Sequence, residues 1–319
     1  MMRIALALML AVALHGLRAQ DYPVKPVRIV VPYGAGSNGE NGLRLIAPEM
    51  EARLGQRLVI EQRPGGGGNV GAAAVAASAA DGYTLLLGAT NNFTINQHLY
   101  KGIGFDPVSA FEPITMIFDI PFLMYSSIAV PARTLGEFVA YAKANPDKLN
   151  YASSGAGTPP HLAGEMLSQL AGIRMTHVPY KSNAQSVAAL LAGEVHLFVG
   201  LISGAQAQVD AGKLRILATA VPQRTSRHPE VPSAREAGFP SLNISTWWAL
   251  AAPRGTPKGV VDRVYAAVQS SLRDASLKDR YEQLGMVPVG NAPAELAAQI
   301  RSEAAAWGEF IRARNIGID

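Results

Sequence analysis

The sequence predicts an α/β protein of two domains, each built on a mostly parallel sheet flanked by helices. A chain of 319 residues is about the length of two ordinary domains. Short apolar, β-rich runs alternate with amphipathic or alanine-rich stretches, which is typical of βαβ units and parallel sheets. The composition, 49% hydrophobic and 16% charged without a low-complexity tract, indicates that the chain buries a large core.

Residues 1–20 have the order of a secretory signal peptide. A cation at Arg3 precedes an apolar run over 4–14, and the small residue Ala19 precedes polar sequence. The apolar run is shorter than the roughly 20 residues that a membrane-spanning helix needs. We expect cleavage near Ala19 or Gln20 and export to the periplasm.

Cysteine content and charge exclude several classes of protein. The chain has no cysteine, which rules out disulfides, thiolate nucleophiles, a lipid-modified N-terminal cysteine and cysteine-type zinc sites. Loss of the signal peptide removes Arg3 and Arg18 and leaves 26 basic and 24 acidic residues, a net charge of +2. This near-balance gives nucleic-acid binding no support.

The first α/β group begins with a strand over 27–31. Helical spacing then runs from Leu43 to Leu54 with Gly55 as a stop, and Pro48 should kink or shorten that helix. The group continues with a strand over 58–61, a glycine-rich loop over 63–69, a helix over about 70–79 and a strand over 83–87.

The second group begins with a helix over 135–144, which Thr134 and Glu137 start as a capping box. The elements that follow are a strand over 149–153, a helix over 161–170, a strand over 175–178, a helix over 183–191, and strands over 195–199 and 214–219.

The last part of the chain is mostly helical, with the clearest helices over 260–272 and 294–311. Two helices cannot bury their own apolar faces, so we expect them to pack on the first group. Domain 1 would then comprise 21–122 and 247–319, and domain 2 would comprise 123–246, with two chain crossings at a hinge.

A glycine pattern after the first strand resembles a dinucleotide-binding loop. Residues 34–39 spell G-x-G-x-x-G, and Glu61 ends the next strand. The nucleotide interpretation is weak because the chain is expected to be exported, because Pro32 and Tyr33 lengthen the turn, and because Pro48 interrupts the helical pattern. The loop still predicts an anion site, since backbone N–H groups gather at a helix N-terminus.

Short motifs in a fixed order extend over the whole mature chain. They are YPVKPVRIVVPY at 22–33, EQRP at 61–64, GGNVG at 67–71, DGYTLL at 81–86, FDP at 105–107, LNYASSG at 149–155, HLAGE at 161–165, HVPYK at 177–181, AGKLR at 211–215, EAG at 236–238 and APRGTP at 252–257. In this order and spacing they resemble the receptors of tripartite tricarboxylate transporters, also called Bordetella uptake gene proteins.

The resemblance implies a clamshell like that of periplasmic binding proteins of type II, with the ligand in a cleft between two α/β domains. It implies a small organic carboxylate as the ligand and no enzymatic activity. The implied partners are the large and small membrane permease subunits that receive the ligand. We expect a monomer without a cofactor, a metal or a nucleic-acid partner.

The resemblance and the usual position of ligands, beyond the carboxyl ends of strands, indicate the same loops. The residues predicted to bind the ligand are Tyr33, Gly34, Ala35, Gly36, Ser37, Asn38 and Glu40 after the first strand, Thr90 and Asn91 after the third, and Ser153, Ser154, Gly157, Thr158, His161, Tyr180, Lys181 and Gly200 in the second domain. Backbone N–H groups, hydroxyls and waters near helix N-termini would hold the carboxylate, shared by both domains.

Two of these residues have an alternative role. His161 is expected to start a helix with a structural role, ahead of any catalytic one. Lys181 either faces the cleft or extends into solvent, and the sequence favours neither.

Three departures from the family pattern bear on specificity. Gly39-Glu40 stands where many members have threonine-aspartate, Gly200 stands where many have an acid, and Ser182-Asn183 follows Lys181 where glycine is common. The missing acid at Gly200 argues against recognition of a ligand amino group at that point.

Two other functions stay open at this stage. One is a sensor subunit that presents its liganded form to a membrane histidine kinase. The other is a secreted serine hydrolase using Ser153 or Ser154 with His161, although no G-x-S-x-G elbow surrounds either serine.

Overall fold

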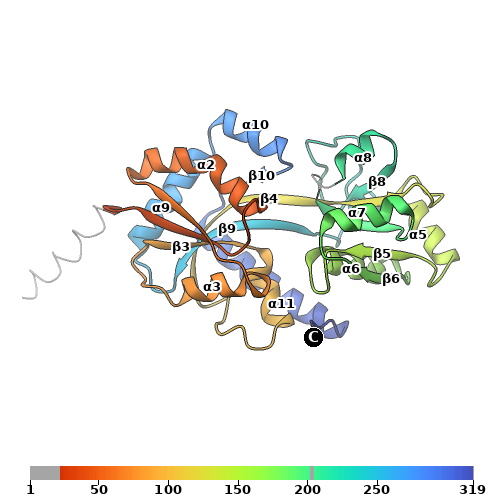
Figure 1. Cartoon of the computed structure of the whole chain (residues 1–319), viewed down its shortest axis with the longest axis horizontal. Helices are drawn as coiled ribbons and strands as arrows, with labels where there is room; N and C mark the ends of the chain where they lie inside the picture. The colour runs from red at the N-terminus through yellow and green to blue at the C-terminus, as the bar shows by residue number, and fades with distance from the viewer. Residues whose placement is uncertain (1–21, 202–204, 319) are drawn as a thin grey trace, which may run out of the picture. The chain divides into compact units, whose positions relative to one another are not determined.

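The computed structural model describes residues 22–201 and 205–318 (Figure 1). The predicted signal peptide and its cleavage site lie outside these residues. Within the described residues, no helix is both long enough and apolar enough to cross a membrane.

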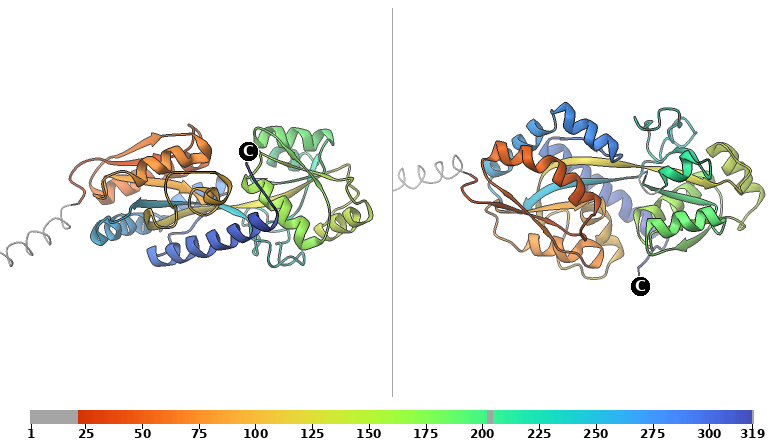
Figure 2. Two further views of the ribbon diagram at one scale, coloured as in Figure 1. Left: turned by 90° about the horizontal axis from the view of Figure 1, so that it is seen from below. Right: turned by 45° about the horizontal axis from the view of Figure 1, so that its top comes forward.

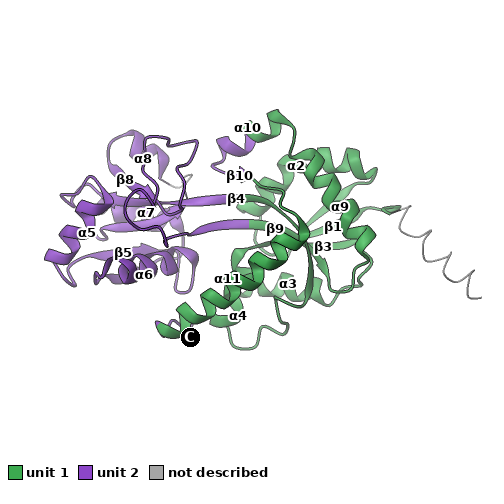
Figure 3. Cartoon of the chain, turned by 180° about the vertical axis from the view of Figure 1, so that it is seen from behind, with its two compact units in different colours: residues 1–118, 248–279, 288–313 green, residues 119–247, 280–287, 314–319 purple. Residues whose placement is uncertain are grey.

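The chain divides into two compact units (Figure 3). Unit 1 comprises the residues up to Phe118 together with Trp248–Asp279 and Pro288–Ala313. Unit 2 comprises Asp119–Trp247, Arg280–Val287 and the residues from Arg314 on.

Unit 1 is built on three parallel strands, β1 (Val27–Val31), β2 (Leu58–Gln62) and β3 (Thr84–Ala89). β1 lies between β2 and β3 and pairs with both, and β9 (Ser245–Pro253) pairs antiparallel with β3. β1 and β3 are almost fully buried, which explains why both appear in the sequence as near-continuous apolar runs.

Helix α2 (Asn38–Leu54) follows β1. It begins where the Ser37 side chain accepts the N–H of Glu40, and it ends at Gly55, whose φ of 73° lies in the left-handed region. The expectation that Pro48 shortens this helix is wrong, because α2 continues to Leu54. Pro48 is exposed on the same side as Arg44, so the Arg44 carbonyl that loses its N–H partner can bind water.

The remaining helices of unit 1 pack on its strands and on one another. α3 (Asn69–Ala76) follows the 3₁₀ turn η1 (Gly66–Gly68), and the π-helical turn η2 (Asn91–Ile95) leads into α4 (Asn96–Leu99). Of the C-terminal helices, α9 (Lys258–Ser271) packs on α2, and α11 (Pro293–Ala313) packs on η2 and α4 (Figure 2). The predicted packing of the two C-terminal helices on the first group is therefore confirmed.

The longest strand, β4 (Phe111–Ser127), is not predicted from the sequence. Pro113 and Pro121 lie inside it, and proline is rare within strands because it donates no ladder hydrogen bond. Two shorter elements after α9 are also missed, α10 (Ala275–Gln283) and β10 (Val287–Pro288).

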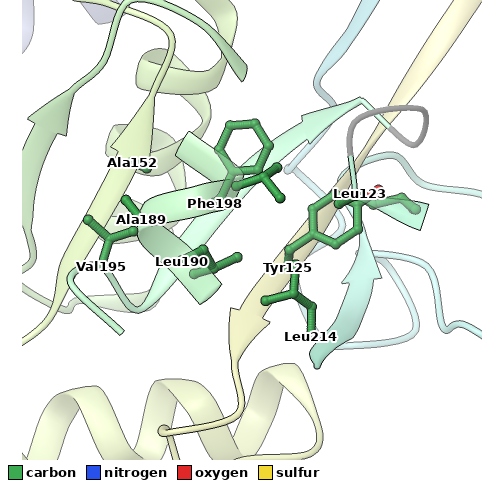
Figure 4. Packing of buried hydrophobic residues seen from close by; sticks show 10 residues of the cluster. Leu123, Tyr125, Ala152, Ala189, Leu190, Val195, Phe198 and Leu214 are labelled. Carbon is green, nitrogen blue, oxygen red and sulfur yellow. The ribbon is translucent and has the colours of Figure 1, made fainter. Parts of the chain in front are cut away.

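Unit 2 has a second set of parallel strands. β5 (Asn150–Ser153) lies between β6 (Thr176–Pro179) and β7 (Leu197–Leu201), and the end of β4 pairs antiparallel with β7 and with β8 (Leu214–Thr219). Their core contains Leu123, Tyr125, Leu190 and Phe198 (Figure 4). The rings of Tyr125 and Phe198 stack with centroids 6.2 Å apart.

The helices of unit 2 are α5 (Leu135–Ala144), α6 (Pro159–Ala171), α7 (Asn183–Ala192) and α8 (Gln206–Asp210). α5 has the predicted limits and the predicted cap, because the Glu137 N–H donates to the Thr134 hydroxyl at 3.1 Å. The Glu137 carboxylate reaches one residue further back than a standard capping box and accepts the N–H of Arg133 at 2.7 Å.

Candidate functional site

In each unit the loops beyond the parallel strands lead directly into helices. β1 leads to α2 and β3 leads to η2 in unit 1, whereas β5 leads to α6 and β6 leads to α7 in unit 2. Ligands of open α/β sheets bind at such loops. The predicted binding residues lie in these four connections and the helical turns they lead into, except Ser153, the last residue of β5, and Gly200, which lies within β7.

The loop between β1 and α2 is organised around a carboxylate of the protein itself. Glu40 is only 5% exposed, and its Oε2 accepts the Gly36 N–H at 2.9 Å. Its Oε1 accepts from the Arg44 guanidinium at 2.7 Å. The hydrogen bond from Gly36 and then Arg44 lower the pKa of Glu40. The Gly36 N–H, predicted to bind the ligand, is therefore already occupied, while Gly34 and Ala35 remain exposed.

Gly39 allows α2 to approach an aromatic side chain closely. A Cβ at Gly39 would lie 2.1 Å from the Trp248 ring, so no other residue fits without moving that ring. Trp248 also packs edge-to-face against Tyr33, with centroids 5.2 Å apart. Trp248 is 4% exposed. Threonine at position 39 of this chain would therefore require the Trp248 ring to move.

Tyr33 belongs to a network of amides beside the glycine-rich loop. Its hydroxyl lies 3.0 Å from Asn91 Oδ1 and 3.1 Å from Asn92 Oδ1. The Nδ2 groups of Asn91, Asn92 and Asn96 all donate to the Gly67 carbonyl. Burial is the main cause that raises the pKa of Tyr33.

The structure brings Tyr33 and Asn91 together as hydrogen-bond partners of each other. Thr90 is 4% exposed, and its carbonyl accepts from the Thr94 hydroxyl at 2.9 Å.

Ser153, at the end of β5, is fully buried in unit 2. Its Oγ lies 2.6 Å from His177 Nε2, donates to the Gly155 carbonyl and accepts the Gly155 N–H. The Ser153 hydroxyl therefore fixes the start of the loop before α6 by its hydrogen bonds to Gly155. Its predicted partner in a serine hydrolase was His161, but the neighbouring imidazole is His177.

Several hydrogen-bond donors of the turn before α6 already bind acceptors in the same turn or in α6. The Gly157 N–H donates to His161 Nδ1 at 3.0 Å, and both the N–H and the hydroxyl of Thr158 donate to the Gly155 carbonyl. Ser154 is half-buried and has no hydrogen-bond partner among the described residues. Within the 153–161 loop, Ser154 is the predicted residue that presents an unused hydroxyl.

His161 contacts the turn before α6 and a second histidine. It is 9% exposed, and its ring stacks on that of His177 with centroids 3.8 Å apart. Because Nδ1 accepts from Gly157, the ring proton resides on Nε2. Burial lowers the pKa of His161 and, together with the nearby charge of His161, lowers that of His177 to about 4.

Two further side chains support this stack. Tyr151 stacks against His177 with centroids 5.0 Å apart and donates from its hydroxyl to Glu165 at 2.7 Å. Glu165 also pairs with Arg314 at 2.5 Å, which accounts for the place of the last residues of the chain in unit 2.

The start of α7 lies beside Ser153. The Ser153 carbonyl accepts the Tyr180 N–H at 2.9 Å and the Ser186 hydroxyl at 3.0 Å. Ser182 caps α7, and Gln185 Oε1 accepts the Lys181 N–H, one residue further back than in a standard capping box, as Glu137 does at α5. The sequence analysis did not name this cap, although the spacing of serine and glutamine three residues apart is its signal. The Lys181 side chain is exposed.

Gly200 is buried, and the Phe198 ring lies in the space that a side chain at position 200 would take. A Cβ at this position would lie 2.2 Å from the Phe198 ring, which stacks on Tyr125. An acid at position 200 would therefore require Phe198 to move. Residues 22–201 and 205–318 also contain no group of three or more histidine or acidic residues placed to hold a metal ion.

Two α/β units with parallel strands, and with helix N-termini at the strand ends, define a solute-binding protein of the periplasmic type. The solved structures support this class. Rpa4515 of Rhodopseudomonas palustris, solved with adipate, has a TM-score of 0.80 and 30% identity over 93% of this chain and 100% of its own. MatC from the same species, solved with malate, has a TM-score of 0.75 and 32% identity over 91% of this chain and 100% of its own. The predicted fold class is confirmed.

The chain belongs to the tripartite tricarboxylate transporter family of receptors, whose model matches residues 43–316. A UPF0065 protein of Bordetella pertussis is 32% identical over 95% of this chain and 94% of its own length. The predicted family is therefore confirmed. Its members are periplasmic solute-binding receptors.

Proposed function

We propose that the chain captures a small organic carboxylate in the periplasm and delivers it to the membrane permease of a tripartite transporter. The observation that carries this proposal is the gathering of helix starts around Ser153 in unit 2. α6 begins six residues after Ser153, and the Ser153 carbonyl binds Tyr180 and Ser186, on either side of the start of α7.

Helix starts at one place favour an anion, because the first N–H groups of each helix have no intrahelical acceptor. Pro159 and Pro160 open α6 and donate nothing, so its first turn offers only the N–H of His161. The first turn of α7, at Asn183 and Ala184, keeps its N–H groups. We propose that these donors and the Ser154 hydroxyl bind the ligand carboxylate.

The adipate and malate of two structural relatives support the carboxylate class. Melting temperatures measured with a panel of mono-, di- and tricarboxylates at pH 7 test it, because a ligand that binds only the folded chain raises the melting temperature. A panel without any stabilising carboxylate contradicts the proposal.

The site is tested with Ser154→Ala by calorimetry on the stabilising ligand. Loss of one hydrogen bond to a charged group should weaken binding about tenfold or more, since such bonds contribute about 1.5–3 kcal/mol. Ser241→Ala is the control, because Ser241 is exposed in the same unit and has no hydrogen-bond partner among the described residues. Equal affinities of the two variants would move the site away from Ser154.

A further inference from the structure

Unit 1 contains a cavity between the start of β4, the end of β9 and α11, and all of its lining residues belong to this unit. Its volume is about 400 Å³, which lies within the range of roughly 300–1,000 Å³ that small-molecule sites have. Phe111 and Ile300 are almost fully buried, so part of the lining is continuous with the core. The apolar residues of the lining are Val108, Phe111, Pro113, Ala297 and Ile300.

The cavity lies at the edge of the sheet opposite the candidate loops of unit 1. β9 runs antiparallel to β3 and pairs Trp248 with Ala89 at the carboxyl end of β3, so the other end of β9 lies beside the amino end of β3. Arg254 follows that end of β9, and its N–H donates to the Ala110 carbonyl, just before β4, at 2.9 Å. Because ligands of open α/β sheets bind beyond the carboxyl ends of the strands, this cavity is separate from the usual ligand site.

Two arginines in the lining have no acidic partner among the described residues. Arg254 Nη1 donates to the Ser109 carbonyl at 3.3 Å, and Arg301 on α11 forms no hydrogen bond or ion pair with any described residue. The acid in the lining is Glu112, whose Oε1 accepts the Gly255 N–H at 3.0 Å. Two guanidinium charges and one carboxylate charge leave the lining with a net charge of +1.

The lining therefore combines two kinds of contact. Guanidinium groups bind carboxylates and phosphates through paired N–H donors. The apolar residues beside them are removed from water when they cover a ring or an aliphatic chain, which is favourable. An inorganic anion would use only the first kind of contact, and an uncharged hydrocarbon would use only the second. A ligand that carries both groups fits the lining best.

We propose that this cavity is a second binding site, which takes a small anion with an apolar body: a carboxylate or a phosphate joined to a ring or to an aliphatic chain. Arg254 and Arg301 bind the charged group, and Phe111, Pro113 and Ile300 contact the apolar body. The site lies wholly in unit 1 and does not rest on the proposed function.

Calorimetry on the unmodified chain at pH 7 and low salt tests both requirements with three probes. Phenyl phosphate has the anion and the ring, inorganic phosphate lacks the ring, and phenol lacks the anion. Phenyl phosphate should bind at least about tenfold more tightly than either of the other two. Binding of phenyl phosphate that is no tighter than that of both other probes overturns the inference. This measurement does not depend on any variant folding.

Ala297→Phe tests whether the probe enters the cavity. Ala297 is half-buried in the lining, and a phenyl ring at this position would take space that the apolar body needs. Binding of phenyl phosphate should weaken about tenfold or more. The matched control is Ala298→Phe, which adds the same ring at the next position of α11, exposed and outside the lining. It should change the affinity less than about twofold, and equal affinities of the two variants overturn the inference.

Arg301→Gln tests the charged contact and should weaken binding of phenyl phosphate about tenfold, because a hydrogen bond to a charged group is lost. Arg312→Gln is the control, since it removes the same charge from the same helix outside the lining. The melting temperature of each variant without a probe shows that it is folded. Equal affinities of these two variants overturn the inference while the proposed function stands. Loss of phenyl phosphate binding in Ser154→Ala also overturns it, because the probe would then bind at the proposed carboxylate site.

Discussion

Single glycines mark where the backbone of this chain approaches aromatic rings. Gly39 and Gly200 both face a ring within 2.3 Å of a hypothetical Cβ, that of Trp248 in unit 1 and that of Phe198 in unit 2. The sequence analysis gives both positions as departures from the family pattern, and in this chain each has a packing reason. Residue identity at such a position therefore reflects its neighbours in the core as well as any ligand.

Gly200→Ala should destabilise the chain by about 1–3 kcal/mol, because the added methyl group overlaps the Phe198 ring. Chemical denaturation measures this change in the free energy of unfolding. The control is a double-mutant cycle, in which Gly200→Ala is also made in a chain that carries Phe198→Leu. In that chain Gly200→Ala should lower the free energy of unfolding by less. An equal loss in both chains would show that the Phe198 ring is not the cause.

At the scale of elements, α2 shows that tertiary packing can keep a helix intact through a proline. Pro48 lies in its interior, where it removes a hydrogen bond, whereas Pro293 lies at the first position of α11, where no N–H is needed. Burial of Leu43, Ile46 and Met50 stabilises α2 on both sides of Pro48.

Pro48→Ala should raise the melting temperature by at least about 2 °C, because it restores a helical hydrogen bond and removes a steric conflict worth up to about 3 kcal/mol. Pro293→Ala is the matched control and should give no increase, since proline at a first helical position is favourable. Differential scanning calorimetry compares the two variants, and equal shifts would contradict the interpretation of Pro48.

The sequence predicts most elements whose signals are local. The predicted limits of α5 and β8 agree with the structure, because the α5 cap and the apolar run of β8 depend only on residues close together in the sequence. β4 and η2 depend on distant partners and are missed. β4 contains two prolines, and η2 is a polar turn whose asparagines are fixed by the Gly67 carbonyl more than 20 residues away. The candidate loops were predicted because their glycines and polar residues are local signals. The use of the Gly36 N–H by Glu40 was missed although the two residues are only four apart, because the residue pattern does not show where the Glu40 side chain turns.

For the molecule as a whole, the neutral histidine stack makes stability depend on pH. Burial lowers the pKa of His161 and that of His177, the latter to about 4, whereas an unfolded histidine has a pKa of about 6.5. Between these values the unfolded chain binds more protons than the folded chain. The stability from these two groups is therefore complete above about pH 6.5 and is lost as the pH falls toward about 4.

The melting temperature should therefore fall as the pH is lowered from 7 to 5, and His177→Gln should reduce that fall. Glutamine can still hydrogen-bond to Ser153 but does not titrate. The range above pH 5 separates the histidines from carboxylates such as Glu236, whose pKa is lowered to about 2, mainly by Arg224. The same slope in the variant and the unmodified chain would contradict this assignment.

The two tryptophans of β9 occupy successive positions and belong to different units. Trp247 lies in unit 2 and Trp248 in unit 1, and both are almost fully buried, at 3% and 4% exposure. Successive side chains of a strand point to opposite faces, so the two indoles have separate surroundings. With Trp307 replaced, either indole can be kept alone by changing the other to phenylalanine, and its emission then reports on one unit. The strand thus carries two natural fluorescent labels, one for each unit.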